Sequence, residues 1–321
     1  MKSLSAAALA LALASTSFAT NPQKSQDDPS QIGDRNVGNC LNLYSIQKEM
    51  ALGQQLAREV TRQSKILDDP IISEYVNRVG QNLARNSDAK VPFTFQVIDG
   101  DEVNAFALPG GYVFIYTGLI KVASEEDELA GALAHEIAHV AARHMTCQAT
   151  KSQIAGVAGA IPGVFLGGWT GYAVRQAASA AIPMTFLSFT RHDESEADYL
   201  GVQYMYAAGY DPTGAIGIFE KLESMLKTKP SAVAKVLATH PMDSDRIDRT
   251  EKEIQRILPS KPEYLVTTSE YRGMRERLIT LENRRKPSPE NLPHLIRAGD
   301  DILPNTDPAA RPTVKRQDIV E

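Results

Sequence analysis

Cysteine, tryptophan and excess positive charge are all scarce in this sequence of 321 residues. Two cysteines are too few for a small disulfide-stapled protein, and a chain of this length forms a hydrophobic core without such staples. The formal net charge of -5 supplies no basic field of the kind that binds duplex nucleic acid. With 43% hydrophobic and 23% charged residues, the composition also excludes collagenous, coiled-coil and wholly disordered proteins. One globular domain with flexible ends is therefore expected.

The first residues are typical of a secretory signal peptide. Lys2 supplies a positive charge, an apolar run follows over residues 4–14, and Ala19 ends a small-x-small cleavage pattern. We expect cleavage after Ala19 and export to a bacterial periplasm, where the mature chain is soluble or peripherally associated with a membrane. In that oxidising compartment Cys40 and Cys147 can pair, although the sequence leaves open whether their geometry permits a bond.

The main domain is expected over residues 42–285, between a flexible lead-in at 20–41 and a proline-rich, loosely ordered tail at 286–321. The spacing of apolar residues and the capping signals predict helices over 44–65, 71–83, 124–147, 190–208, 212–227, 243–258 and 269–284. Alternating patterns predict short strands over 93–97, 103–108 and 112–116, which form a small antiparallel sheet. The fold class is therefore α+β and mostly helical.

The predicted helix 124–147 contains the sequence His135-Glu136-Ile137-Ala138-His139. Residues four apart share one face of a helix, so His135 and His139 can bind the same metal ion. Zinc polarises a carbonyl group and lowers the pKa of bound water to about 7, while a nearby carboxylate accepts the proton. Glu136 is placed for that second task, so the motif indicates zinc-dependent hydrolysis.

A catalytic zinc ion needs a third protein ligand and one open position. Ala142 and Met145 stand where the metzincin motif requires glycine and histidine, which excludes that class. A second helix offers a carboxylate instead: Glu194 can ligate zinc, and Asp198, one turn later, can accept the free ring N–H of a zinc histidine. Glu196 is expected to point elsewhere.

This combination resembles the gluzincin family of metalloendopeptidases, which includes the CAAX prenyl endopeptidase and the bacterial HtpX-like and BepA-like proteases. The resemblance rests on the HExxH sequence at 135–139 and on Glu194-x-x-Ala197-Asp198-x-x-Gly201. The segments 104–111 and 239–241 also look like parts of its exported bacterial branch. The similarity covers roughly residues 42–281, and the combination is far more specific than any one motif.

The resemblance implies a zincin-type fold with one zinc ion per chain, held by His135, His139 and Glu194, and Glu136 as the general base. It also implies that the strand around Asn104, Ala105 and Phe106 is an edge against which a substrate peptide lies.

The histidine that matches His240 can reach the zinc in BepA-like members and hold a resting state, so the resemblance implies a regulatory or a transition-state role for His240. We expect His144 and His192 to be structural and assign no role to His294.

The chain differs from the BepA-like and the HtpX-like proteases in one feature each. After Leu258 the remaining residues are too few and too proline-rich for an array of tetratricopeptide repeats, so docking to the outer-membrane assembly machinery through such repeats is not expected. The membrane helices that flank the HtpX-like domain are also absent from the pattern. A segment rich in glycine and alanine, 150–187, interrupts the helices; over 152–174 it suits a lid over the cleft, a membrane-surface contact or a membrane span.

The sequence thus predicts a zinc metalloendopeptidase that acts on misfolded or misassembled cell-envelope proteins in protein quality control. One alternative is a latent or non-proteolytic chaperone or assembly factor whose zinc site is plugged. A second is a metallohydrolase for another substrate, although the extended edge strand favours a peptide. Nucleic acid is not an expected partner, and the natural substrate and oligomeric state stay open.

Overall fold

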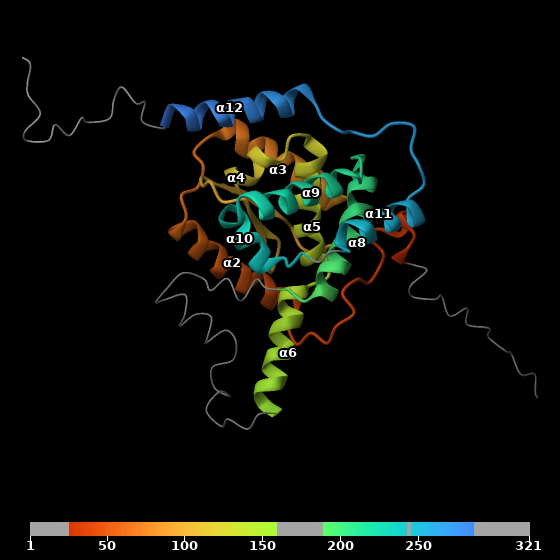
Figure 1. The fold of residues 1–321 in the computed structure, drawn as a ribbon. Helices are drawn as coiled ribbons and strands as arrows, with labels where there is room; N and C mark the ends of the chain where they lie inside the picture. Colours follow the sequence, from red (N-terminus) through yellow and green to blue (C-terminus); the bar gives the residue numbers. More distant parts are fainter. Residues whose placement is uncertain (1–25, 159–188, 243–244, 286–321) are drawn as a thin grey trace, which may run out of the picture. The chain divides into compact units, whose positions relative to one another are not determined.

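The computed structural model describes residues 26–158, 189–242 and 245–285 (Figure 1). The expected signal peptide, the tail 286–321 and the segment 159–188 lie outside these residues. Residues 1–280 and 281–321 form two separate units, and the elements below belong to the first apart from the end of the last helix. Its helices and strands are η1 (Pro29–Gln31), α2 (Ile46–Gln63), α3 (Pro70–Arg85), β1 (Thr94–Ile98), β2 (Ala105–Leu108), β3 (Tyr112–Tyr116), α4 (Thr117–Val122), α5 (Glu126–Ala141), α6 (His144–Ala158), α8 (Arg191–Ala208), α9 (Gly214–Thr228), α10 (Pro230–Thr239), α11 (Arg246–Ile257) and α12 (Ser269–Arg285).

The three strands form one mixed sheet in the order β1-β3-β2. Strand β2 pairs with β3 in antiparallel fashion, but β1 is parallel to β3, so the prediction of a wholly antiparallel sheet is wrong for β1. The reason is the route of the chain, which passes from β1 to the far edge and then returns through Pro109-Gly110-Gly111 into the middle. Gly110 and Gly111 have φ values of +76° and +92°, which suit glycine in a tight turn. The α+β, mostly helical class is confirmed.

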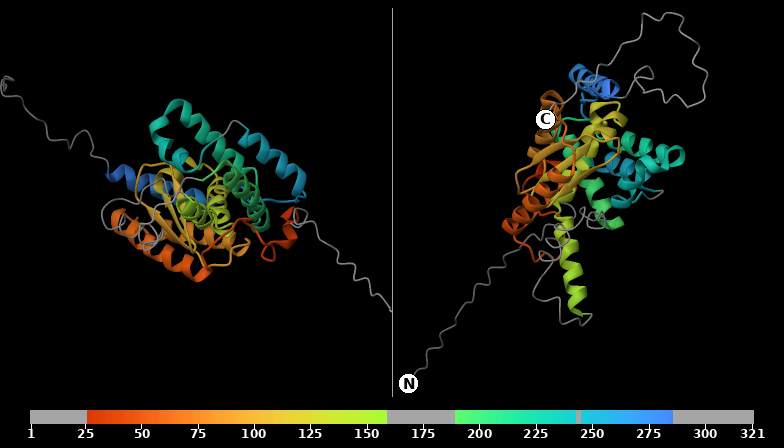
Figure 2. Two further views of the ribbon diagram at one scale, coloured as in Figure 1. Left: turned by 90° about the horizontal axis from the view of Figure 1, so that it is seen from below. Right: turned by 90° about the vertical axis from the view of Figure 1, so that its left-hand side faces the viewer.

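The sheet lies between α2 and α5 (Figure 2). On the α2 side, Phe106 and Phe114 stack with ring centroids 5.2 Å apart and form a buried cluster with Leu52 and Leu56. Because side chains alternate along a strand, Ala105 and Ala107 of β2 face the α5 side. Small side chains there let the backbone of the strand come close to the helix that carries HExxH.

Helix α5 is buried on nearly all sides. Helices α8 and α9 pack against it, and Gly131 makes the close approach possible. A Cβ atom at Gly131 would lie 2.9 Å from the Cα atom of Ala215 on α9. A helix surrounded in this way holds its polar side chains in a water-poor interior.

The helix predicted over 124–147 is two helices. Glu125 rather than Ser124 is the N-cap of α5, and the helix ends at Ala141. Arg143 then adopts a φ of +58°, and α6 begins at His144. The side chain of Arg143 is held beside the break, where its Nε donates to Glu49 Oε1 over 2.8 Å. A further helix that the sequence did not indicate, α10, follows α9 directly.

Part of the expected flexible lead-in is fixed to the domain. Arg35 is 4% exposed and pairs with Asp88 at 2.6 Å, so this segment has a buried anchor. Cys40 and Cys147 form a disulfide, with Cα atoms 6.0 Å apart, which answers the question that the sequence left open. The bond joins the segment before α2 to the first turn of α6.

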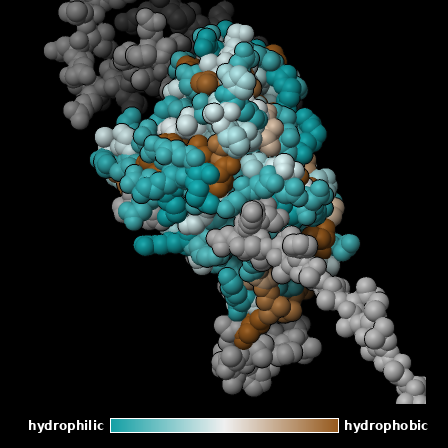
Figure 3. Space-filling view, turned by 90° about the vertical axis from the view of Figure 1, so that its right-hand side faces the viewer, coloured by the Kyte–Doolittle hydropathy of each residue, from teal (hydrophilic) through white to brown (hydrophobic). Residues whose placement is uncertain are grey.

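Helix α6 extends away from the other helices (Figure 1) and carries hydrophobic surface (Figure 3). Ile154 on this helix is 45% exposed. Among the described residues, no helix combines the length and apolar character needed to cross a bilayer. Most of the segment for which we considered a lid or a membrane contact lies outside the described residues.

Candidate metal centre

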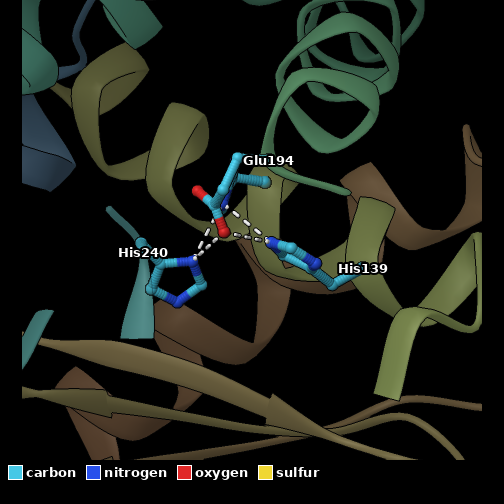
Figure 4. A group of neighbouring side chains, drawn as sticks. His139, Glu194 and His240 are labelled. Atoms are coloured by element: carbon cyan, nitrogen blue, oxygen red, sulfur yellow. Dashed lines mark hydrogen bonds and ion pairs between the residues drawn. The ribbon is translucent and has the colours of Figure 1, made fainter. Parts of the chain in front are cut away.

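Four buried side chains from three elements converge on one point. His135 and His139 come from adjacent turns of α5, Glu194 from the first turn of α8, and His240 from the C-cap of α10. One nitrogen or oxygen atom from each lies within 4.8 Å of the others. Figure 4 shows Glu194 between the rings of His139 and His240, above the sheet. The structure therefore brings the three predicted ligands and His240 together.

The spacing of these atoms fits tetrahedral coordination. His135 Nε2 lies 3.0 Å from His139 Nε2, 3.2 Å from His240 Nδ1 and 3.4 Å from Glu194 Oε2. Glu194 Oε1 lies 3.0 Å from His240 Nδ1 and 3.4 Å from His139 Nε2. Ligand atoms bound tetrahedrally at 2.0–2.1 Å from zinc lie about 3.3–3.4 Å apart. A set of three imidazoles and one carboxylate is also a normal zinc donor set.

Asp198, on the same helix as Glu194, contacts His135 from behind. Its Oδ1 lies 3.0 Å from His135 Nδ1, so the ring can donate there and keep the Nε2 lone pair for a metal. Arg246, the first residue of α11, donates to both Asp198 oxygens over 2.7 and 2.8 Å. Its guanidinium also lies 3.2 Å from Glu194 Oε2 and 4.1 Å from the centroid of the Phe219 ring. Sequence reasoning missed Arg246, because a charged residue at the start of a polar helix normally faces solvent.

The charges around the centre favour a cation. Burial alone would raise the pKa of Asp198, but Arg246 and the hydrogen bond with His135 lower it, so this carboxylate is ionised at neutral pH. Burial also opposes the charge of Glu194, yet the neighbouring His240 and His135 hold its pKa well below the ordinary range. The Oε2 atom of Glu136 is buried without a hydrogen-bond partner in the described part of the chain, and Glu194 Oε2 forms an ion pair with Arg246 at 3.2 Å. Buried carboxylates in this number require a compensating positive charge.

The catalytic candidate Glu136 lies beside the four donors. Its side chain is 4% exposed, and its Oε1 lies 3.3 Å from His240 Nε2. The His240 ring thus lies between the donor set, which its Nδ1 joins, and Glu136. This position fits the regulatory role that the resemblance implied.

His144 and Glu196, for which the sequence predicted no role at the metal centre, connect to it through a chain of contacts. His144, which we expected to be structural, has its Nδ1 2.8 Å from His139 Nδ1. Its Nε2 lies 3.1 Å from Glu196 Oε2, and Glu196 points away from the four donors, as expected. His192 is exposed, in keeping with a structural role, and His294 is outside the described residues.

Strand β2 forms the edge of the sheet beside the centre. Tyr116 N donates to Asn104 O over 3.0 Å, so Asn104 faces into the sheet. In an antiparallel pair the bonded and non-bonded positions alternate, which directs the backbone groups of Ala105 and Ala107 away from β3. Ala105 lines a pocket with His135 and Glu136. Ala107 lines another pocket with His139, so the outward groups flank the metal centre.

A buried HExxH helix, with a carboxylate ligand from a second helix and a sheet edge alongside, defines a metallopeptidase. Residues 70–254 match peptidase family M48, and the chain belongs to this family. The resemblance drawn from the motifs is thereby confirmed.

Several proteins of known name are similar to the chain. The beta-barrel assembly-enhancing protease of Yersinia pestis is 31% identical over 243 residues, which cover 72% of this chain and 49% of the relative. For that of Escherichia coli strain K12 the identity is 30% over 222 residues, 67% of this chain and 45% of the relative. The mitochondrial metalloendopeptidase OMA1 of Schizosaccharomyces pombe is 33% identical over 191 residues, 56% of this chain and 52% of the relative. The chain spans about half the length of these relatives.

Proposed function

We propose that the chain is a zinc-dependent endopeptidase, with zinc held by His135, His139 and Glu194 and with Glu136 as general base. The observation that carries the proposal is the set of donor atoms on α5 and α8, spaced 3.0–3.4 Å apart next to the buried carboxylate of Glu136. Asp198 orients His135 through the Nδ1 contact. Membership of peptidase family M48 supports the same reaction.

In the proposed mechanism, zinc would polarise the scissile carbonyl and acidify the attacking water. The Glu136 carboxylate accepts a proton from that water and then delivers it to the leaving nitrogen. Asp198 and Arg246 hold His135 and Glu194 in position throughout, because Asp198 contacts the His135 ring and the Arg246 guanidinium pairs with the Glu194 carboxylate. The buried surroundings strengthen these interactions by excluding bulk water.

For the substrate we propose an extended segment of a misfolded or misassembled envelope protein. Such a segment would add a strand to the β2 edge and pair with the outward backbone groups of Ala105 and Ala107. The names of the Yersinia pestis and Escherichia coli relatives, which refer to beta-barrel assembly, support a substrate in the cell envelope. Export to the periplasm, after removal of residues 1–19, completes this proposal.

We further propose that the observed arrangement is a latent state. His240 Nδ1 supplies a fourth donor, whereas a catalytic zinc needs an open position. Helix α10 also lies near the sheet edge, since Val103 N lies 3.4 Å from Ala232 O. Displacement of His240 would open the metal and Glu136 together. The chaperone alternative shares the plugged site but is not favoured by the names of the relatives.

The test of the activity is cleavage of unfolded casein by the mature chain and by its Glu136→Gln variant, with zinc content matched. We expect zinc to bind both proteins and turnover to fall about 100- to 10,000-fold in the variant, because the general base is lost. Equal cleavage by both would contradict the role of Glu136. Loss of zinc from the variant would show that Glu136 is a ligand instead.

The test of latency is the same assay with His240→Ala. We expect faster cleavage than with the unmodified chain, because the fourth donor is removed while His135, His139 and Glu194 remain. His192→Ala, an exposed histidine on α8, is the matched control and should leave the rate unchanged. If both His240→Ala and the unmodified chain bind zinc but neither cleaves, the site is non-proteolytic.

A further inference from the structure

A second arm of hydrogen-bonding groups reaches the metal centre through His139, whereas Asp198 contacts His135. The backbone N–H of Gly38 donates to Glu196 Oε1 over 3.0 Å. Glu196 Oε2 contacts His144 Nε2 at 3.1 Å, and His144 Nδ1 contacts His139 Nδ1 at 2.8 Å. His144 and His139 are both 3% exposed, so these ring contacts are shielded from water. The arm therefore links the N-terminal segment, α8 and α6 to a proposed zinc ligand.

The direction of the hydrogen bonds follows from the two ends of the arm. An ionised carboxylate only accepts hydrogen bonds, so His144 Nε2 carries the hydrogen and donates a hydrogen bond to Glu196. When His139 binds the metal through Nε2, its Nδ1 carries the proton and donates to Nδ1 of His144. In that tautomer the lone pair of His139 is on Nε2, which is the atom facing Glu194 and His135. Asp198 imposes the same tautomer on His135 directly.

This arrangement depends on the break between α5 and α6. Residues five apart on one continuous helix do not face each other, because neighbours on a helix surface are three or four apart. The left-handed conformation of Arg143 turns the chain and brings the ring of His144 against that of His139. The backbone conformation at Arg143 thus has a direct consequence at the metal centre.

The outer end of the arm is held just as closely. Gly38 has a φ of +74°, and a Cβ atom there would lie 2.0 Å from the carbonyl oxygen of Ala142, at the end of α5. A glycine is therefore required for the segment to pass this close to the helix break. Cys40, two residues later, is bonded to Cys147 on α6 and holds the segment in place.

We propose that His144 and Glu196 are positioning residues that fix the tautomer and orientation of His139 for metal binding, as Asp198 does for His135. This inference rests on the proposed function, because it takes His139 as a zinc ligand. It gives the centre two separate orienting arms, one for each histidine of the HExxH sequence. Partners of this kind change metal affinity about 10- to 100-fold when they are removed.

The test measures the zinc dissociation constant of the mature chain by competition with a chelator. We expect His144→Phe to weaken zinc binding about 10- to 100-fold, because the Nδ1–H of His139 loses its acceptor. Glu196→Leu should weaken it similarly, whereas Glu196→Gln keeps an acceptor oxygen for His144 and should lose less. His192→Phe and Glu263→Gln change exposed residues and serve as controls with unchanged affinity.

Double variants separate the arm from a general loss of stability. His144→Phe combined with Glu196→Leu should bind zinc as weakly as the worse single variant, because both break the same arm. Either one combined with Asp198→Asn should weaken zinc binding further than either change alone, because Asp198 acts on the other histidine. Nitrogen-15 NMR of the zinc-loaded chain should also show the Nδ1–H tautomer of His139, and a loss of this pattern in Glu196→Leu.

The outcomes distinguish the two proposals. If the unmodified chain binds no zinc, or if His139→Ala binds it equally well, the proposed function itself fails. If the unmodified chain binds zinc through His139 but His144→Phe and Glu196→Leu leave its affinity and the tautomer unchanged, only the positioning role fails.

Discussion

At the scale of single residues, the candidate metal centre contains a buried positive charge that belongs to no recognised sequence motif. Arg246 is 2% exposed and contacts Asp198, Glu194 and the face of the Phe219 ring. Its planar guanidinium can bond both oxygens of Asp198 while it packs against an aromatic ring, which a lysine does less well. Asp198 can therefore remain ionised in the interior and accept a hydrogen bond from His135.

We expect Arg246→Met to lower the free energy of unfolding by about 3–5 kcal/mol, because Asp198 then becomes a buried charge without its main partner. Urea unfolding of the chelator-stripped protein checks this without a contribution from zinc. Arg249→Met is the matched control: its side chain is 30% exposed and lies 4.0 Å from Asp198, so it should cost less than about 1 kcal/mol. Equal losses in both variants would contradict a special role of Arg246.

The limits of sequence reasoning are clearest for these residues. His135, Glu136, His139 and Glu194 follow from helical spacing and zinc chemistry; the helices bring the three predicted ligands together, and Glu136 lies beside them against His240. The part played by His144 depends instead on a left-handed residue between two helices. A helical pattern does not encode that break, and the Arg143 side chain at the break contacts Glu49, 94 positions earlier in the sequence.

At the scale of elements, β2 combines a sheet edge with close contact to α5. Phe106 fixes the strand against α2, while the side chains of its alanine neighbours face the metal centre. The strand can therefore expose backbone groups at the edge without losing its packing. Only the backbone register identifies those groups; the sequence pointed to the strand but not to Ala107.

Ala107→Pro tests this directly, because proline removes the outward N–H but no hydrogen bond to β3. Loss of one backbone hydrogen bond to the substrate should lower kcat/KM for casein about tenfold, with zinc affinity unchanged. Ala107→Gly keeps the N–H and should retain most of the activity. Unchanged kcat/KM in the proline variant would count against pairing at this edge.

At the scale of the whole molecule, the fold class and the family were predictable, whereas long-range links were not. Periodicity and caps gave most helices, including α8, which begins after Thr190 and ends at Gly209. The parallel pairing of β1 depends on how the chain passes around the sheet. The buried position of Arg35 depends on Asp88, a partner 53 positions later in the sequence. Local patterns carry no record of either.

The disulfide is the long-range link that is easiest to test. It closes a loop with a sequence separation of 107 residues, so its removal should lower the free energy of unfolding by about 2–4 kcal/mol. The variant to measure is Cys40→Ser with Cys147→Ser, by urea unfolding after zinc is stripped. The unmodified chain in reductant should behave like the variant; equal stability with and without reductant would contradict a stabilising bond.

The order of the ligands along the chain has a consequence for how the protein matures. Cys40, both α5 histidines and Cys147 all emerge before Glu194, and His240 and Arg246 emerge last. A chain that crosses a membrane from its N-terminus can therefore close its disulfide while it still holds only two of the metal-binding side chains. Tight metal binding requires Glu194 and therefore α8. The resting contact of His240 requires α10, which emerges later still. Under the proposed export, the metal site and the contact of His240 would therefore be completed last, after the framework around α5 has formed.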